Sequence, residues 1–552
     1  MDTEEYEKKM KGLLESGPYK KLKKDPTGSI KRKTTELIKK IIVDSQIRKR
    51  ITPQDPKTSV IYGLPKIHKE GTPLRPIISA IDSPTYQLAR YIATSLQIEV
   101  EKANSYVKNS THFLDLIQNV KMEMDGILVS FDVVSLFTKI PRGGAISILR
   151  KKFGEDTANL AEICLMTIYF KWKGEYYEQT EGAPMGSPIS PAVANIYMED
   201  LETSALEKAP FKPSMWLRYV DDTFVIWRHG REKLEEFHLY LNSIDEDIKF
   251  TKEVESDGKL PFLDLLITRK EDGSLGHTVY RKPTNTNKYL LAGSHHHPAQ
   301  IYGVMSTMIH RSITLTEEDH RAEELNKLTN ILMKNGYRRR EIRTAISRKL
   351  SKKDSRMEEE KTEEQQKKAF LPYIKGVTDK ISRILHKHQI KTVFKPRTQI
   401  RDIIRNVKGR EKLETEGVYQ LKCGTCDQVY VGETGRTIRT RVKEHSAAIR
   451  LGHADKSAVA EHAAQGHTID VNNPKILARE KYFKTRIFQE ALEIKKHKNN
   501  FNRDNGQKIS DTWLPVISRK TSFQKTHYHH PPPINRCEIK TTRSFVLMRS
   551  PA

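Results

Sequence analysis

The feature that most constrains this chain is a pair of adjacent aspartates between two apolar arms. The segment RYVDDTFVIW places Asp221 and Asp222 at the tip of a predicted strand–turn–strand hairpin. A third aspartate, Asp132, ends the apolar, strand-like run LVSFD. Carboxylates in such surroundings are costly unless they bind something positive. A lone Asp-Asp pair is most often a plain turn, so the upstream Asp132 is what favours a functional site.

Two divalent cations would neutralise these three carboxylates. Mg²⁺ prefers a few carboxylate oxygens together with substrate phosphates over a complete protein cage. In an in-line phosphoryl transfer, one metal activates the attacking 3′-hydroxyl and a second stabilises the leaving pyrophosphate. Asp132, Asp221 and Asp222 are therefore predicted to be catalytic and to hold two Mg²⁺.

The charge balance also indicates a polyanionic partner. Lysine and arginine number 96 against 70 aspartates and glutamates, a net charge of +26. Such an excess most simply suits nucleic acid, with a merely soluble basic protein as the plain alternative. No apolar run approaches the length of a membrane span, and the start MDTEEYEKKM is not a secretory leader. We therefore expect an intracellular protein with no membrane partner.

Changes in sequence texture predict an α+β protein of several domains. Residues 1–57 are charged and expected to be helical. From 58 to 305, short β-branched and aromatic runs alternate with helical stretches, as is typical of a domain built on a sheet. Residues 306–412 are predicted to be helical and basic, 413–505 to be a compact segment of short strands and helices, and 506–552 to be a disordered tail.

Two apolar stripes at helical spacing carry the helical prediction for 306–412. Between them, KLSKKDSRMEEEKTEEQQKK is almost free of apolar residues and is either a solvated helix or a flexible linker. The stripes are Leu325, Leu328, Ile331 and Leu332, and then Ile374, Val377, Ile381, Ile384 and Leu385.

Two acidic motifs resemble the metal-binding strands of reverse transcriptases. These are FDVVSLF at 131–137 and YVDD at 219–222. The resemblance assigns Phe137 to the steric-gate position, where a bulky ring would clash with a ribose 2′-hydroxyl and favour deoxynucleotides. The segment EGAPMGSPISPAVANIYME at 181–199 resembles the element that packs on the incoming nucleotide, with Gly186 allowing close backbone approach.

The segment at 62–79, YGLPKIHKEGTPLRPIIS, resembles the fingers region of these polymerases. The resemblance implies that Arg75 binds the triphosphate and that Lys66 binds the triphosphate or template phosphates. A surface ion pair is the alternative for Arg75.

The exact sequences of these motifs resemble a narrower group than the reverse transcriptases in general. GLPKIHK, LRPIIS, FDVVSLFTKIP and LPFLDLLITR together resemble the Penelope-like retroelement polymerases, relatives of the telomerase catalytic subunit, over residues 1–305. This implies a right-hand polymerase, with fingers and palm on an antiparallel sheet and a helical thumb at 306–412. SHHHP at 294–298 lies within this stretch and is interpreted as native sequence.

A second set of polar residues lies in GVYQLKCGTCDQVYVGETGRTIRTRVKEH at 417–445. Tyr419 and Tyr430 stand on two strand-like pieces, and Arg441 and His445 follow on one face of a predicted helix. Glu490 lies on another amphipathic helix. A tyrosine or histidine that relays a proton, an arginine that neutralises phosphate and a carboxylate that holds one Mg²⁺ would suffice for phosphodiester cleavage.

The spacing of these residues alone does not distinguish them from ordinary surface residues. However, the segment resembles a GIY-YIG endonuclease domain, a small α/β nuclease that Penelope-like elements carry after the polymerase. The motifs read GVY and YVG here, and Asn502 resembles the late asparagine of that family.

Cysteine and histidine spacing within this segment fits a zinc site. Cys423 and Cys426 form C-x2-C, and His462 and His467 form H-x4-H, which suits a tetrahedral Cys₂His₂ centre. Penelope-type nuclease domains resemble this arrangement. Two free thiols with two surface histidines are the alternative, and His453 is a possible substitute ligand.

The resemblances together imply a retroelement protein that nicks target DNA and copies RNA from the exposed 3′ end. Its partners would be an RNA template, a DNA primer, target DNA and dNTPs, with phosphates gripped by basic clusters at 337–343 and 386–391. Nuclear localisation follows from genomic DNA as target. The alternatives are an inactive or N-terminally truncated copy that only binds nucleic acid, and a telomerase-like host polymerase.

Overall fold

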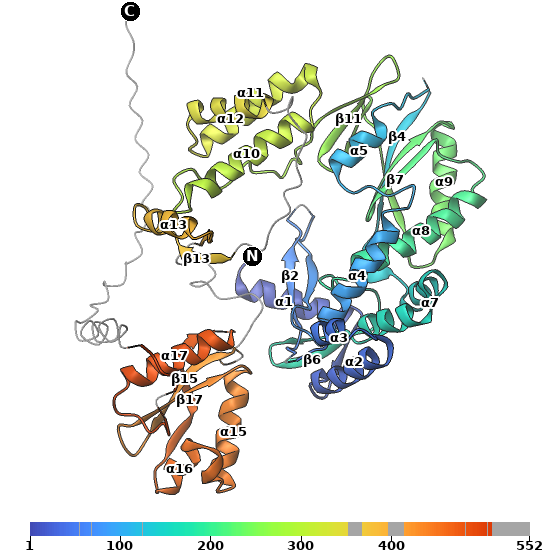
Figure 1. Cartoon of the computed structure of the whole chain (residues 1–552). Coiled ribbons are helices and arrows are strands. Elements are labelled where there is room, and N and C mark those ends of the chain that lie inside the picture. Colours follow the sequence, from blue (N-terminus) through green and yellow to red (C-terminus); the bar gives the residue numbers. More distant parts are fainter. Residues whose placement is uncertain are drawn as a thin grey trace, which may run out of the picture. The chain divides into compact units, whose positions relative to one another are not determined.

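The chain divides into two compact units, residues 1–409 and 410–552 (Figure 1). The computed structural model describes residues 1–54, 56–67, 69–123, 125–351, 367–395, 413, 415–480, 482–504 and 506–510. Most of the predicted tail and of the acidic stretch after residue 351 lies outside these residues. In the described part, no helix is long and apolar enough to cross a membrane.

The N-terminal segment is not purely helical, contrary to the prediction. Ser16-Gly17-Pro18 ends α1, and the next residues form β1, which pairs with β6 of a five-stranded sheet ordered β1-β6-β5-β2-β3. Residues 1–57 are therefore tied into the same sheet as the fingers motif. The elements are α1 (Thr3–Ser16), β1 (Tyr19–Leu22), α2 (Thr27–Ile41), α3 (Ser45–Ile51), β2 (Val60–Pro65), β3 (Leu74–Ser79), β5 (Tyr169–Trp172) and β6 (Glu175–Gln179).

A four-stranded antiparallel sheet, ordered β7-β8-β4-β9, forms the centre of the first unit. In β8, Val225 and Trp227 face one apolar core while Phe224 and Ile226 face a second one. Burial on both faces explains the unbroken apolar run TFVIW. The strands are β4 (Ile127–Val133), β7 (Met215–Tyr219), β8 (Asp222–Trp227) and β9 (Phe250–Val254); the helices include α4 (Tyr86–Val100), α6 (Leu136–Lys139), α7 (Arg142–Met166), α8 (Ser190–Lys208) and α9 (Gly230–Ile244).

The second core is closed by a smaller antiparallel sheet. Phe113 packs on Phe224 and Phe262 with ring centroids 4.9 and 4.7 Å apart. These contacts join the central sheet to the LPFLDLLITR hairpin. The elements are α5 (Ser110–Ile117), β10 (Lys259–Phe262), β11 (Leu265–Arg269) and β12 (Leu275–Val279).

Three helices follow, α10 (Pro298–Thr314), α11 (Glu318–Lys334) and α12 (Arg339–Ser351). Leu328 and Leu332 of the predicted stripe are buried in their common core. The predicted domain boundary between residues 305 and 306 falls inside α10.

The second apolar stripe, predicted to be helical, lies on a helix only from its third residue, Ile381, onward. Gly376 has φ +78°, which a helix does not permit, so α13 (Thr378–Lys387) begins later. It connects the parallel strands β13 (Lys368–Pro372) and β14 (Lys391–Lys395). The stripe is also not a core face, since Ile374, Val377, Ile381 and Ile384 are between 41% and 58% exposed.

The second unit is a three-stranded antiparallel sheet, ordered β16-β15-β17, with helices on it. Its core gathers Tyr419 and Leu421 from the central strand with Ile438, Val442 and Val459 from the helices. The elements are β15 (Gly417–Cys423), β16 (Val429–Thr434), α15 (Ile438–Arg450), α16 (Ala458–Ala464), β17 (Ile469–Arg479) and α17 (Phe483–Lys496).

Candidate active sites

The three predicted aspartates are brought together at one end of the central sheet. Asp132 on β4 and Asp222 on β8 are direct cross-strand partners, so their side chains leave the same face about 5 Å apart at Cβ. Asp221 lies in the turn before β8, and its carbonyl accepts a hydrogen bond from the Val133 amide at 3.1 Å. The predicted hairpin with an acidic tip is therefore present.

The electrostatics of this group suit cation binding. Burial, then repulsion from Asp221 and Asp132, raises the pKa of Asp222 to about 6. Burial and Asp221 likewise raise the pKa of Asp132, while Lys69, Lys66 and Lys282 oppose that rise. The carboxylates thus lack sufficient positive charge nearby, and a divalent cation would supply it.

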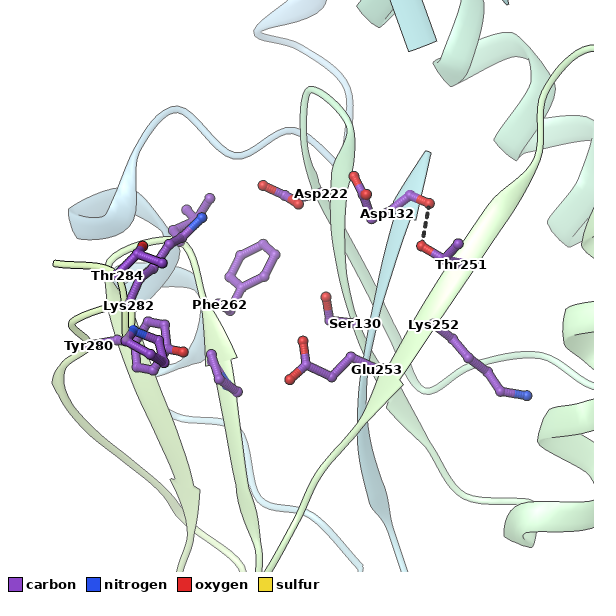
Figure 2. Close-up of a pocket in the computed structure, with 13 residues that line it drawn as sticks. Ser130, Asp132, Asp222, Thr251, Lys252, Glu253, Phe262, Tyr280, Lys282 and Thr284 are labelled. Atoms are coloured by element: carbon purple, nitrogen blue, oxygen red, sulfur yellow. Dashed lines mark hydrogen bonds between the residues drawn. The ribbon is translucent and has the colours of Figure 1, made fainter. Parts of the chain in front are cut away.

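A cavity of about 650 Å³ opens beside Asp132 and Asp222 (Figure 2). The central sheet forms one wall, while β10 and the segment after β12 form the other. In Figure 2, Lys282 and Thr284 lie on the wall facing Asp222, and the Thr251 hydroxyl donates to the Asp132 carbonyl at 3.3 Å. Lys282 was missed from the sequence, because a lysine in RKPTN has no distinguishing pattern. The cavity is lined by Ser130, Asp132, Asp222, Thr251, Lys252, Glu253, Pro261, Phe262, Leu263, Tyr280, Lys282, Pro283 and Thr284.

The two predicted phosphate-binding cations lie on the adjacent strands β2 and β3. Burial lowers the pKa of Lys66, Arg75 and Lys69 lower it further, and Asp132 raises it. These mutual effects place a positive group near the aspartates. Arg75 is exposed, and it forms no ion pair within the part of the chain that the structure describes, so the surface-pair alternative has no support there.

The segment that contains Gly186 is hydrogen-bonded to Phe137 through the nearby Ala183. Phe137 lies on α6, partly buried against the main core, and its carbonyl accepts from the Ala183 amide at 2.6 Å. Gly186 has φ +132°, and a Cβ there would clash with the Ile78 carbonyl of β3. The close approach expected at Gly186 is therefore made to β3, and contact with a nucleotide stays a prediction.

The predicted nuclease residues meet in the second unit. The Tyr419 hydroxyl and His445 Nε2 are 2.8 Å apart, and His445 Nδ1 lies 2.8 Å from the Ser457 hydroxyl. Burial lowers the pKa of His445 to about 4, with a further contribution from Arg441. The ring is therefore neutral near pH 7 and able to pass a proton. Ser457 was missed, because its only sequence signal is that of a helix N-cap.

Tyr430, Arg441 and Glu490 surround this pair. The Tyr430 and His445 rings are 5.3 Å apart. Burial raises the pKa of Tyr430, Arg441 lowers it and Glu490 raises it, so both charges act on one site. Burial, then Glu433, raises the pKa of Glu490 to about 7. Asn502 instead has a structural position, since its amide exchanges two hydrogen bonds with the Val431 backbone, at 3.0 and 2.6 Å.

The four predicted zinc ligands form one cluster. One ligand atom from each of Cys423, Cys426, His462 and His467 lies within 4.8 Å of the others. Desolvation raises the pKa of the Cys423 thiol, but hydrogen bonds, including those from the Cys426 and Thr425 amides, lower it to about 6 in all. His453 does not belong to the cluster. The donor set of two thiols and two imidazoles fits a tetrahedral metal.

Comparison with known families places part of the first unit in a described domain family. Residues 67–250 match the family described as Reverse transcriptase (RNA-dependent DNA polymerase), and this range contains Asp132, Asp221 and Asp222. The chain contains a reverse transcriptase domain. Residues 288–347 match the Animal helix-turn-helix domain, which covers α10, α11 and most of α12. No curated protein matches the sequence.

Similar solved structures are nucleic-acid polymerases. Telomerase from Candida albicans, in complex with a fragment of telomeric RNA, is 12% identical over 63% of this chain, with a TM-score of 0.41. The RNA-dependent RNA polymerase of a human picorbirnavirus is 10% identical over 64% of this chain and 72% of its own, with a TM-score of 0.38. This chain spans 59% of the Candida albicans telomerase. At these TM-scores the likenesses carry no argument about function.

Proposed function

We propose that the chain is an RNA-directed DNA polymerase of a Penelope-like retroelement that also carries a DNA-nicking nuclease. The main observation that supports polymerase activity is that Asp132 pairs with Asp222 across two strands, with Asp221 in the adjoining turn. All three aspartates lie inside the region that matches reverse transcriptases. Asp132 and Asp222 line a cavity and have raised pKa values, and together with Asp221 they suit a two-metal phosphoryl transfer.

At the polymerase site, Asp132, Asp221 and Asp222 would hold two Mg²⁺, which supply activation of the primer 3′-hydroxyl and neutralisation of the leaving pyrophosphate. Lys66 and Arg75 would orient the triphosphate. Phe137, on the short helix after Asp132, would exclude a ribose 2′-hydroxyl and so select dNTPs.

The primer–template would bind the helical region after the cavity. Exposed arginines on and just before α12 form no ion pair within the described chain, which suits phosphate contacts without sequence choice. They are Arg338, Arg339, Arg340, Arg343 and Arg348.

For the second unit we propose a GIY-YIG endonuclease. Tyr419 and the neutral His445 would move a proton at the attacking water, and Arg441 would neutralise the scissile phosphate. Glu490 would hold one Mg²⁺. The Cys423, Cys426, His462 and His467 cluster would bind a structural zinc.

Together the two activities support target-primed synthesis, in which a nick in genomic DNA supplies the primer end and RNA is copied from it. This mechanism requires access to nuclear DNA, so nuclear localisation belongs to the same proposal. The alternative is a chain that binds nucleic acid without catalysis.

Primer extension tests the polymerase directly. The full chain receives an RNA template, a DNA primer, Mg²⁺ and dNTPs, beside the variant Asp221→Asn/Asp222→Asn and the control Asp156→Asn on the exposed face of α7. Extension by the wild type and the control, but not by the double variant, supports the proposal. If none extends the primer while all bind it, the non-catalytic alternative is correct.

A further inference from the structure

The turn that carries Asp221 has a conformation that its sequence does not favour. Tyr219 pairs with Asp222, so Val220 and Asp221 alone connect β7 to β8. Val220 has φ +59°, in the left-handed region, where a β-branched residue is uncommon. A two-residue hairpin loop with positive φ at its first position usually has glycine there. Contacts from outside the turn must therefore stabilise it.

One such contact comes from a buried arginine on β7. Arg218 is 2% exposed, and its partner Glu202 on α8 is 4% exposed. Arg218 Nε donates to both Glu202 carboxylate oxygens, at 2.8 and 2.9 Å. Nη1 donates to Asn195 Oδ1 at 2.6 Å and reaches the Val220 carbonyl at 3.4 Å. The guanidinium thus connects helix α8 to the strained residue.

Further hydrogen bonds hold Arg218 and Asn195 of this network in place. Arg218 Nη2 donates to the Asn195 carbonyl at 3.2 Å, and Asn195 Nδ2 donates to the Pro191 carbonyl at 3.0 Å. The Arg218 amide donates to the Ser105 carbonyl at 2.6 Å. A buried polar network with its partners satisfied rigidifies the elements that it joins.

We propose that Arg218, Glu202 and Asn195 are positioning residues, which hold the Val220–Asp221 turn so that Asp221 and Asp222 face Asp132. The proposal deepens the proposed polymerase function and rests on it. These residues touch neither substrate nor metal, because they lie buried between β7 and α8. Their loss should therefore weaken metal binding and lower kcat, while the KM for primer–template stays the same.

The first test removes the network and keeps the packing. Replacement of both partners of a buried ion pair by apolar residues is often tolerated, whereas removal of one partner is not. The variant Arg218→Met/Glu202→Leu is therefore compared with wild type by thermal unfolding, by Mn²⁺ titration followed by electron paramagnetic resonance, and by primer extension. We expect unfolding close to wild type, Mn²⁺ affinity lower by about fivefold or more, and kcat lower by about tenfold or more, since small misplacements of reacting groups have such effects.

Two further variants distinguish the positioning role from a general folding defect. Arg218→Lys keeps a cation beside Glu202, but a single ammonium lacks the planar fork that reaches Asn195 and Val220 together. It should show the same loss of Mn²⁺ affinity, and addition of Val220→Gly, which relieves the strain, should restore part of it. The matched control Arg281→Met/Glu324→Leu removes a partly buried ion pair, between the segment after β12 and α11, and should keep wild-type Mn²⁺ affinity.

The outcomes separate the two proposals. Wild-type Mn²⁺ affinity and kcat in folded Arg218→Met/Glu202→Leu, or in Arg218→Lys, would overturn the positioning role. A wild-type chain that binds Mn²⁺ through the aspartates without extending primer would contradict the polymerase function only, since the affinity comparison still decides the positioning role. A wild-type chain that binds Mn²⁺ no better than Asp221→Asn/Asp222→Asn would overturn both.

Discussion

His462, one of the four clustered cysteine and histidine residues, stacks on Phe501 with ring centroids 4.1 Å apart and planes 5° from parallel. Phe501 in turn stacks on Tyr430 at 5.9 Å, and Tyr430 meets His445 edge to face at 5.3 Å. A continuous row of rings therefore leads from the proposed zinc site to the proposed nuclease site. The two proposed sites are thus connected by direct ring packing.

Loss of the cluster should destabilise the second unit. Cys426→Ser is expected to reduce bound zinc, measured by plasma mass spectrometry, from one per chain to nearly none. The free energy of unfolding of the unit should fall by more than about 4 kcal/mol, as is usual for a lost metal site. His453→Ala, outside the cluster, is the control and should keep its zinc. A purified wild-type chain without zinc that unfolds as Cys426→Ser does would refute the metal site.

Mg²⁺ dependence of polymerisation should change with pH. The pKa of Asp222 is about 6, above its ordinary value, because of burial and the neighbouring Asp221 and Asp132. Below pH 6 a proton competes with the metal, so half-saturating Mg²⁺ should rise about fourfold between pH 7.5 and 5.5. In the metal-free protein the folded state binds the extra proton, so this group's contribution to stability falls as pH rises from about 4 to 6.

A titration of extension rate against Mg²⁺ at several pH values checks this prediction. A half-saturating concentration that is constant from pH 7.5 to 5.5 would show that no proton competes with the metal at Asp222. The experiment also separates pH effects on metal binding from those on chemistry, which remain at saturating Mg²⁺.

The acidic hairpin and the cysteine–histidine cluster could be predicted because their signals are local. Apolar arms around Asp221 and Asp222 encode two strands and a turn, and strand alternation then sets Asp222 against Asp132. The short spacings between Cys423 and Cys426 and between His462 and His467 likewise fix each half of the cluster. In both cases the residue type carries the chemistry, and the fold only has to bring two local motifs together.

Other parts of the site depend on tertiary contacts that the sequence does not display. Arg218 stands in a strand pattern where an arginine normally faces solvent, and only the packing of α8 buries it against Glu202. The pairing of β13 with β14 is also non-local. The helical prediction for 306–412 therefore missed these two strands, although Ile381, Ile384 and Leu385 of the apolar stripe do lie on α13.

Substitution of Tyr419 should abolish nicking while the unit stays folded. Tyr419→Phe removes the hydroxyl that lies 2.8 Å from His445 Nε2. The unpaired imidazole should lower stability by about 1–3 kcal/mol, and loss of the proton relay should lower the nicking rate by about 10²-fold or more. Supercoiled plasmid, Mg²⁺ and the full chain provide the assay, with Tyr482→Phe, an exposed tyrosine of the same unit, as control. Equal nicking by Tyr419→Phe and wild type would exclude Tyr419 from catalysis.

The pH profile of nicking should reflect Glu490. Its pKa is about 7, because burial and Glu433 disfavour the charged form. Nicking at low Mg²⁺ should therefore increase as pH rises through 7, and higher Mg²⁺ should move the midpoint to lower pH by favouring the carboxylate. Glu490→Gln should remove activity at every pH. A midpoint that is independent of Mg²⁺ would mean that Glu490 does not bind the metal.

The arginines of α12 should contribute affinity for duplex nucleic acid without sequence preference. Ile342 and Ala345 bury one side of the helix, which leaves Arg339 and Arg343 on the exposed side. Each arginine that contacts a phosphate releases about one counterion, so Arg339→Gln/Arg343→Gln should reduce the slope of log K against log salt by about 2. Fluorescence anisotropy of a labelled RNA–DNA hybrid at several salt concentrations measures the slope. An unchanged slope would mean that these arginines form a solvated face, and that the positive surface for the primer–template lies elsewhere in the chain.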